Sequence, residues 1–116
     1  MTETLTVTSE YGLDALAAIL HESSIEKGFW DGEYTNEKFA VKLALIHSEV
    51  TEVLEAIRKS QGSEKIVEEI ADVLIRTLDL YAAMSNKELA THSLDEVLEN
   101  KIAINKSREW LHGNLF

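Results

Sequence analysis

The feature that most constrains this chain is the complete absence of proline from 116 residues, together with only five glycines. Proline removes a backbone N–H and clashes with the preceding helical turn, and glycine weakens helix interiors. Their scarcity permits long uninterrupted helices and argues against a turn-rich sandwich or barrel. Because 45% of the residues are apolar, the chain can also bury one core. We therefore predict a single all-α domain over residues 1–116.

Four segments of the chain repeat apolar residues at helical spacing. They cover residues 9–27, 36–61, 63–84 and 93–112. The residues that can end or cap these helices are Gly28, Gly62, Thr35 or Asn36, Ser63 and Ser93. A very short turn joins the second and third segments, so these two helices should pack antiparallel within a four-helix bundle.

The charge of the chain limits its partners. Acids outnumber Lys plus Arg by 21 to 11, giving a formal charge of −10, which opposes contact with nucleic-acid polymers and anionic membranes. The absence of cysteine excludes disulfides, thiolate metal sites and thiol nucleophiles. The N-terminal residues do not resemble a signal peptide and no apolar run could span a membrane, so we expect a cytoplasmic protein.

Two acidic pairs stand out on the second and third helices. Glu49-x-x-Glu52 is followed, after sixteen residues, by Glu69-x-x-Asp72. At about 100° per residue, each pair lies on the flank of an apolar stripe that should be buried. These stripes consist of Leu43, Ile46, Val50, Val53 and Ile57 on one helix and Ile66, Ile70, Val73, Thr77 and Tyr81 on the other.

Antiparallel packing of the stripes could bring the four carboxylates together, where their repulsion would favour a hard cation. Oxygen ligands suit Mg²⁺, with Mn²⁺ as a substitute, and Mg²⁺ commonly completes its shell with phosphates. Acidic pairs are also common on solvated helix faces. A non-catalytic acidic helical interaction module is therefore the alternative.

Together with Lys27-Gly28-Phe29-Trp30-Asp31 and the C-terminal His112-Gly113, the two acidic pairs resemble the MazG-like all-α NTP pyrophosphohydrolases, which are related to dCTP pyrophosphatases and dimeric dUTPases. The resemblance implies Mg²⁺-dependent hydrolysis of a nucleoside triphosphate, ribo or deoxy, to the monophosphate and pyrophosphate. An enzyme restricted to dUTP is a further alternative. The implied metal ligands are Glu49, Glu52, Glu69 and Asp72, with Glu52 or Glu49 as the general base.

The resemblance also suggests substrate-binding residues. Trp30, Phe29 and His21 correspond to positions that contact the nucleobase, although an aromatic pair in a loop can equally fill a core. Three residues on one face of the last helix could hold phosphate: Lys101, Asn105 and Arg108. Arg76 could reach phosphate or pair with an acid.

The short chain is expected to gain core and pocket walls by assembling as a homodimer or homotetramer, in which a second chain helps to close the site. Leu45, Ile75 and Leu78 fall outside the buried stripes and are the expected contacts between chains. Residues 4–8 alternate like a strand, and are either frayed or paired with another chain.

Overall fold

The computed structural model describes residues 12–108, which form four α-helices with no strand among them. The helices are α1 (Gly12–Glu26), α2 (Asn36–Arg58), α3 (Ser63–Asn86) and α4 (Leu94–Ser107). The all-α class and the four helices are thus confirmed. The strand-like residues 4–8 lie outside the described part. Within that part, no helix is both long and apolar enough to cross a membrane.

Two predicted helix caps are confirmed. The Lys38 backbone N–H donates to Thr35 Oγ1 (3.1 Å) at the start of α2, and Glu96 N–H donates to Ser93 Oγ (3.3 Å) at the start of α4. The cap at Ser63 is wrong. Gly62 turns the chain with a positive φ of 95° and takes the cap position, which leaves Ser63 as the first helical residue.

The last helix also ends earlier than predicted. We expected it to continue to about His112, but α4 ends at Ser107, and Arg108 already has extended backbone angles. The exposed surface of α4 supplies the reason, since none of its residues is buried and little tertiary packing stabilises this helix.

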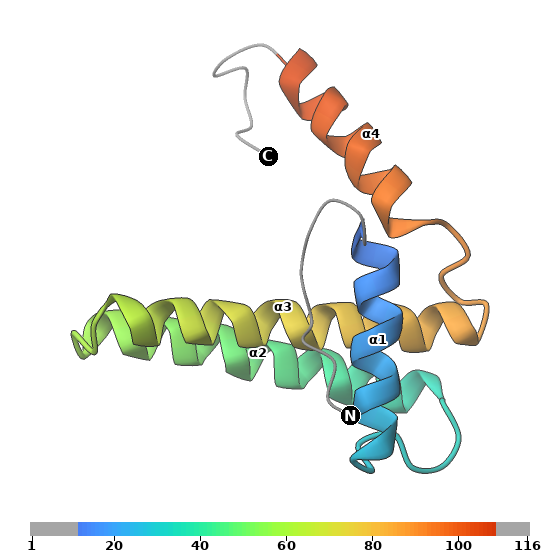
Figure 1. Cartoon of the computed structure of the whole chain (residues 1–116), viewed down its shortest axis with the longest axis horizontal. Helices are drawn as coiled ribbons and strands as arrows, with labels where there is room; N and C mark the ends of the chain where they lie inside the picture. The colour runs from blue at the N-terminus through green and yellow to red at the C-terminus, as the bar shows by residue number, and fades with distance from the viewer. Residues whose placement is uncertain (1–11, 109–116) are drawn as a thin grey trace, which may run out of the picture.

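The second and third helices form a long antiparallel pair, and α1 crosses this pair near one end (Figure 1). Two buried clusters lie at this crossing. One contains Leu16, Ala17, Leu78 and Ala82, and the other contains Trp30, Phe39, Leu80 and Ala83. The hydrophobic core therefore sits at the end of the pair where α2 begins and α3 finishes.

The predicted stripes are not buried along their whole length. Val50, Ile57 and Ile70 are 51%, 55% and 45% exposed, because no third helix among residues 12–108 covers the far half of the pair. The assignment of Leu78 to a contact between chains is also wrong, since α1 covers this side chain and leaves it 5% exposed. Leu45 and Ile75 are exposed.

The fourth helix packs against α1 through two aspartates that cap each other's helices. Asp95 Oδ1 accepts from the Leu13 backbone N–H (2.7 Å), and Asp14 Oδ1 accepts from the Leu94 backbone N–H (2.9 Å). Gly12 permits this approach, since it has a φ of +64° and a Cβ there would lie 2.8 Å from Asp95. From this junction α4 extends clear of the α2–α3 pair (Figure 1).

Candidate metal centre and nucleotide cavity

Three carboxylates converge where α2 and α3 leave the core. Glu49 lies on α2, and Glu69 and Asp72 lie one turn apart on α3. One oxygen from each of the three carboxylates lies within 4.8 Å of the others. Glu69 is buried, Glu49 is half-buried and Asp72 is exposed, so the group opens to one side.

Two cationic side chains balance this group. Arg76 Nε lies 2.6 Å from Glu49 Oε1, which is the ion pair with an acid that the sequence allowed. Lys65 Nζ lies 2.8 Å from Glu69 Oε1. The hydrogen bond to Glu69 raises the pKa of Lys65, and the charges of Glu69 and of Glu52 raise it further.

The fourth predicted ligand, Glu52, is exposed and is not one of the three residues whose oxygens converge. Its charge nevertheless acts on Lys65, which is the partner of Glu69. The structure thus brings together three of the four predicted ligands and leaves Glu52 at their edge.

The chemistry of the group fits a divalent cation. Its donors are all carboxylate oxygens, which suit Mg²⁺ or Mn²⁺ better than zinc or copper. Its open side leaves room for water and phosphate ligands, and Arg76 and Lys65 can neutralise the acids when no cation is bound. Glu49, Glu69 and Asp72 are therefore the residues that could hold the metal.

A cavity of about 350 Å³ adjoins the carboxylates, with Glu49, Asp72 and Arg76 at its edge. Its other walls come from the last turns of α1, the turn that follows and α3, and consist of Leu20, Ser23, Ser24, Lys27, Phe29, Ile75 and Asp79. Phe29 is 59% exposed and lines this cavity. This volume lies within the range typical of small-molecule sites.

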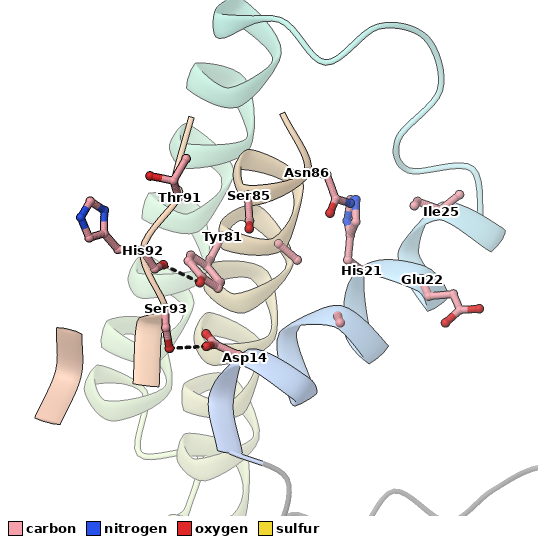
Figure 2. Close-up of a pocket in the computed structure, with 12 residues that line it drawn as sticks. Asp14, His21, Glu22, Ile25, Tyr81, Ser85, Asn86, Thr91, His92 and Ser93 are labelled. Carbon is pink, nitrogen blue, oxygen red and sulfur yellow. Dashed lines mark hydrogen bonds between the residues drawn. The ribbon is translucent and has the colours of Figure 1, made fainter. Parts of the chain in front are cut away.

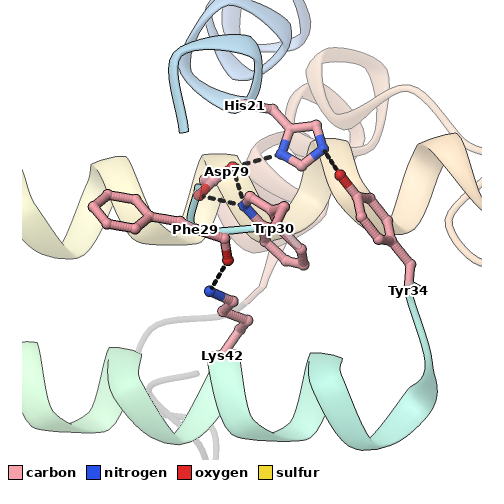
Figure 3. A network of polar contacts seen from close by, with 6 residues as sticks. All are labelled: His21, Phe29, Trp30, Tyr34, Lys42 and Asp79. Carbon is pink, nitrogen blue, oxygen red and sulfur yellow. Dashed lines mark hydrogen bonds and ion pairs between the residues drawn. The ribbon is translucent and has the colours of Figure 1, made fainter. Parts of the chain in front are cut away.

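Trp30 and His21 have different surroundings from Phe29 (Figure 3). Trp30 is buried and its Nε1 donates to Asp79 Oδ2 (3.0 Å), while His21 Nδ1 lies 2.6 Å from Asp79 Oδ1. Tyr34 Oη lies 3.1 Å from the other ring nitrogen of His21. Burial, and then the charge of Asp79, raise the pKa of Tyr34. These contacts fix the turn after α1 onto α3.

Lys42, on α2, contacts the same turn. Its Nζ donates to the Phe29 carbonyl oxygen (2.6 Å) and lies 4.7 Å from the centre of the Trp30 ring. Of the two aromatic residues predicted to contact a base, Trp30 thus fills a core and Phe29 faces the cavity beside the carboxylates.

A second cavity, of about 470 Å³, is shown in Figure 2. The α1 residues that line it lie on the face of the helix opposite to those that line the first cavity. His21 lines this cavity and not the one beside the carboxylates. Asp14, which also lines the second cavity, already accepts hydrogen bonds from Ser93 Oγ and the Leu94 backbone N–H. A role for His21 at the carboxylate cavity would therefore be indirect, through Asp79.

The predicted phosphate-binding residues of the last helix are exposed. Lys101 and Asn105 lie on α4, and Arg108 follows its end. Because α4 packs on α1 and meets α3 only at its first residue, Leu94, the chain does not bring these side chains to its own carboxylates.

Sequence reasoning missed three residues of this region: Lys65, Asp79 and Ser24. Helical spacing could have indicated two of them, since Lys65 lies four residues before Glu69 and Asp79 lies seven after Asp72. No spacing could have found Ser24, because its position depends on how α1 crosses α3.

Comparison with known proteins agrees with this geometry. The family model for the MazG nucleotide pyrophosphohydrolase domain matches residues 38–109, which is more than half of the chain. The match includes Glu49, Glu69 and Asp72 and begins after α1. No curated protein and no solved structure matches the chain. On the strength of the family model, this chain belongs to the MazG nucleotide pyrophosphohydrolase family.

Proposed function

We propose that this chain hydrolyses nucleoside triphosphates, ribo or deoxy, to the monophosphate and pyrophosphate in a reaction that depends on Mg²⁺, with Mn²⁺ as a substitute. The observation that carries the proposal is the convergence of Glu49, Glu69 and Asp72 beside a cavity of about 350 Å³. Membership of the MazG family supports the same chemistry.

The reaction adds one water molecule across the bond between the α- and β-phosphates, and pyrophosphate leaves without a covalent enzyme intermediate. A divalent ion held by the three carboxylates would polarise a phosphate oxygen and lower the pKa of a bound water. Glu52, at the edge of the group, is suited to accept the proton of the attacking water, with Glu49 as the alternative. Once Glu49 is engaged as a ligand, Arg76 is free to hold a phosphate oxygen.

We further propose that a second copy of the chain completes the site in a homodimer or homotetramer. The far half of the α2–α3 pair carries an apolar groove lined by Val50, Val53, Leu54, Ile57, Ile70, Val73 and Leu74. Exposed apolar patches of this kind commonly mark interfaces between chains. Ile102 and Ile104 of α4 are 47% and 49% exposed, so that helix also has apolar surface to bury.

Charge favours contact between α4 of one copy and the carboxylates of another. Lys101 and Lys106 make the C-terminal half of α4 basic in a chain of net charge −10, and Arg108 follows directly after this helix. Lys101, Asn105 and Arg108 would then reach the substrate phosphates from the second copy, and Phe29 would face the base.

The proposal is tested by incubating the protein with each common NTP and dNTP, including dUTP, and measuring pyrophosphate release with and without Mg²⁺. We expect release that stops when the metal is chelated. Release from dUTP alone would identify a dUTP-restricted enzyme. If no nucleotide is hydrolysed and calorimetry detects neither metal nor nucleotide binding, the non-catalytic interaction module becomes the better description.

A further inference from the structure

The two cations beside the carboxylates differ in what else they can reach. Arg76, the partner of Glu49, lines the cavity of about 350 Å³, so it can turn to a phosphate when Glu49 is engaged. Lys65, the partner of Glu69, does not line that cavity and lies in the half of the α2–α3 pair that α1 leaves uncovered. The role given to Arg76 therefore does not extend to Lys65.

The side chain of Glu69 is the least exposed of the three carboxylates and has one cationic partner. It is 9% exposed, against 18% for Glu49, and among residues 12–108 only Lys65 forms an ion pair with it, at 2.8 Å from Nζ to Oε1. Glu49 and Asp72 each place an oxygen within 4.8 Å, so their charges add repulsion. A buried charge without a counter-charge is strongly destabilising. In the metal-free protein, Lys65 supplies that counter-charge.

A bound divalent ion would supply the same counter-charge. Because Glu69 is one of the three residues that could hold the ion, the ion and the Lys65 ammonium would meet at one carboxylate. The two cations repel each other, and most strongly where water is partly excluded, as it is around Glu69. The presence of Lys65 at Glu69 therefore opposes metal binding.

Lys65 also has somewhere to go. Its side chain is 48% exposed and its four-carbon stem is flexible, so the ammonium can move without breaking the core. Glu52 and Glu68 are close enough for their charges to act on it. Displacement from Glu69 thus leaves Lys65 in water beside other acids.

We propose that Lys65 competes with the metal for Glu69: it holds this carboxylate while no metal is bound, leaves it when a divalent ion binds, and so sets the Mg²⁺ affinity of the site. This inference rests on the proposed function, since it uses the metal site at Glu49, Glu69 and Asp72. The site then fills at a higher Mg²⁺ concentration than the three carboxylates alone would require.

The test compares the Mg²⁺ dissociation constants of the wild-type chain and Lys65→Met by isothermal titration calorimetry. Methionine keeps most of the length of lysine and loses its charge, so the variant should bind Mg²⁺ ~10-fold more tightly. Lys65→Arg keeps the charge and should stay within ~3-fold of the wild type. Lys65→Gln, which also lacks the charge, should bind more tightly as well, and replaces Lys65→Met if that variant does not fold.

The matched control is Lys59→Met. Lys59 Nζ lies 3.5 Å from Glu55 Oε2, four residues away on the same stretch of chain, and neither residue belongs to the carboxylate group. This change removes the same charge from a similar ion pair, so the Mg²⁺ affinity should equal that of the wild type.

Thermal unfolding gives a second readout that needs no turnover. Without metal, Lys65→Met should unfold at a lower temperature than the wild type, because Glu69 loses its counter-charge. With saturating Mg²⁺ the two proteins should unfold at nearly the same temperature, since Lys65 has then left Glu69. A merely structural ion pair would instead lower the melting temperature equally with and without the metal.

Results against the inference differ from results against the proposed function. If the wild type binds Mg²⁺ and Lys65→Met binds it equally well, Lys65 is only a structural partner of Glu69. Weaker binding by Lys65→Met would mean that Lys65 supports Glu69 as a ligand. Both results overturn the inference and leave the proposed function standing. If the wild type binds no Mg²⁺ with or without nucleotide, the proposed function itself fails and this inference falls with it.

Discussion

The two halves of the α2–α3 pair differ in how much of their apolar surface is buried within the chain. Near α1, Leu78, Leu80, Ala82 and Ala83 of α3 and Phe39 of α2 are buried. In the far half, between residues 50 and 74, the only buried residues are Ala56 and Glu69. Two helices alone can cover only the seam between them, so the far half leaves apolar side chains in water.

The carboxylate group lies where these two halves meet. Glu49 and Asp72 border a cavity whose other walls come from α1, the following turn and α3, while Glu69 lies towards the exposed half. One side of the cavity is thus walled by the chain itself, and the other side lies next to exposed helix surface. The cavity is therefore built on the half of the pair that α1 covers and borders the half that is exposed.

The largest expected effect comes from removing ligand charge at this boundary. Glu49→Gln, Glu69→Gln and Asp72→Asn should each lower Mg²⁺-dependent turnover by at least ~100-fold, because each keeps the shape but loses a metal ligand. Glu49 and Glu69 form ion pairs with Arg76 and Lys65, so their variants also lose a stabilising contact. Asp72 makes no ion pair among the described residues, so Asp72→Asn should leave the melting temperature of the metal-free protein unchanged or raised. Full activity in two of the variants would refute a shared site.

Glu52→Gln tests whether this residue accepts a proton or binds the metal. We expect a comparable loss of turnover if Glu52 accepts the proton of water, although the three converging carboxylates remain. Calorimetric Mg²⁺ affinity should then change little for Glu52→Gln but fall for Glu49→Gln. Equal loss of affinity in both would make Glu52 a ligand.

The next effect tests whether a second copy covers the far half. Leu54 and Leu74 are 51% and 57% exposed, and changing both to Asp should yield a monomeric mass by light scattering, with turnover reduced by ~10-fold or more. Leu89→Asp is the control, since Leu89 is 55% exposed but lies after α3. A monomeric wild-type protein with full turnover would show that no second copy is needed to cover the far half.

A smaller effect is expected at Asp79, which joins α3 to α1 and to the turn that follows it. Asp79→Ala removes the acceptor for Trp30 Nε1 and the partner of His21 Nδ1, which should cost ~2–4 kcal/mol in the free energy of unfolding measured with urea. Asp31→Ala, at an exposed position in the turn, serves as the control. An unchanged stability would mean that apolar packing alone holds the turn.

The smallest effect concerns the junction of α1 and α4. Burial opposes ionisation of Asp14, but hydrogen bonds from Ser93 and Leu94 outweigh it, so its pKa lies below the ordinary 3.8. A lowered pKa stabilises the fold fully above pH 3.8 and loses that contribution as pH falls through the lowered value. Asp14→Asn should therefore cost up to ~1 kcal/mol at neutral pH and less near pH 2.

Unfolding by urea at the two pH values checks this prediction. Glu22→Gln, an exposed change on the same helix, should show no such dependence. A cost for Asp14→Asn that stays constant with pH would mean that the shape of the side chain, and not its charge, caps α4.

The helices and the acidic pairs could be predicted because they depend on local spacing. Apolar period and cap residues identified four helices, since Thr35 and Ser93 act within one turn of their own helix. Glu49, Glu69 and Asp72 were found because a short turn forces α2 and α3 to be antiparallel neighbours. The assignment of Leu78 to a contact between chains was wrong, because apolar periodicity does not show which side of a helix another helix will cover.

Which residues share a cavity depends on how the helices pack, and helical spacing does not reveal it. The crossing of α1 over α3 buries Trp30 against Asp79, brings Phe29 to the cavity beside the carboxylates and directs His21 to the opposite face. The path of α4, fixed by the reciprocal caps at Asp14 and Asp95, keeps Lys101 and Arg108 from the carboxylates of their own chain. Local sequence determines a helix and its faces, whereas the angle at which two helices pack depends on side chains distant in sequence.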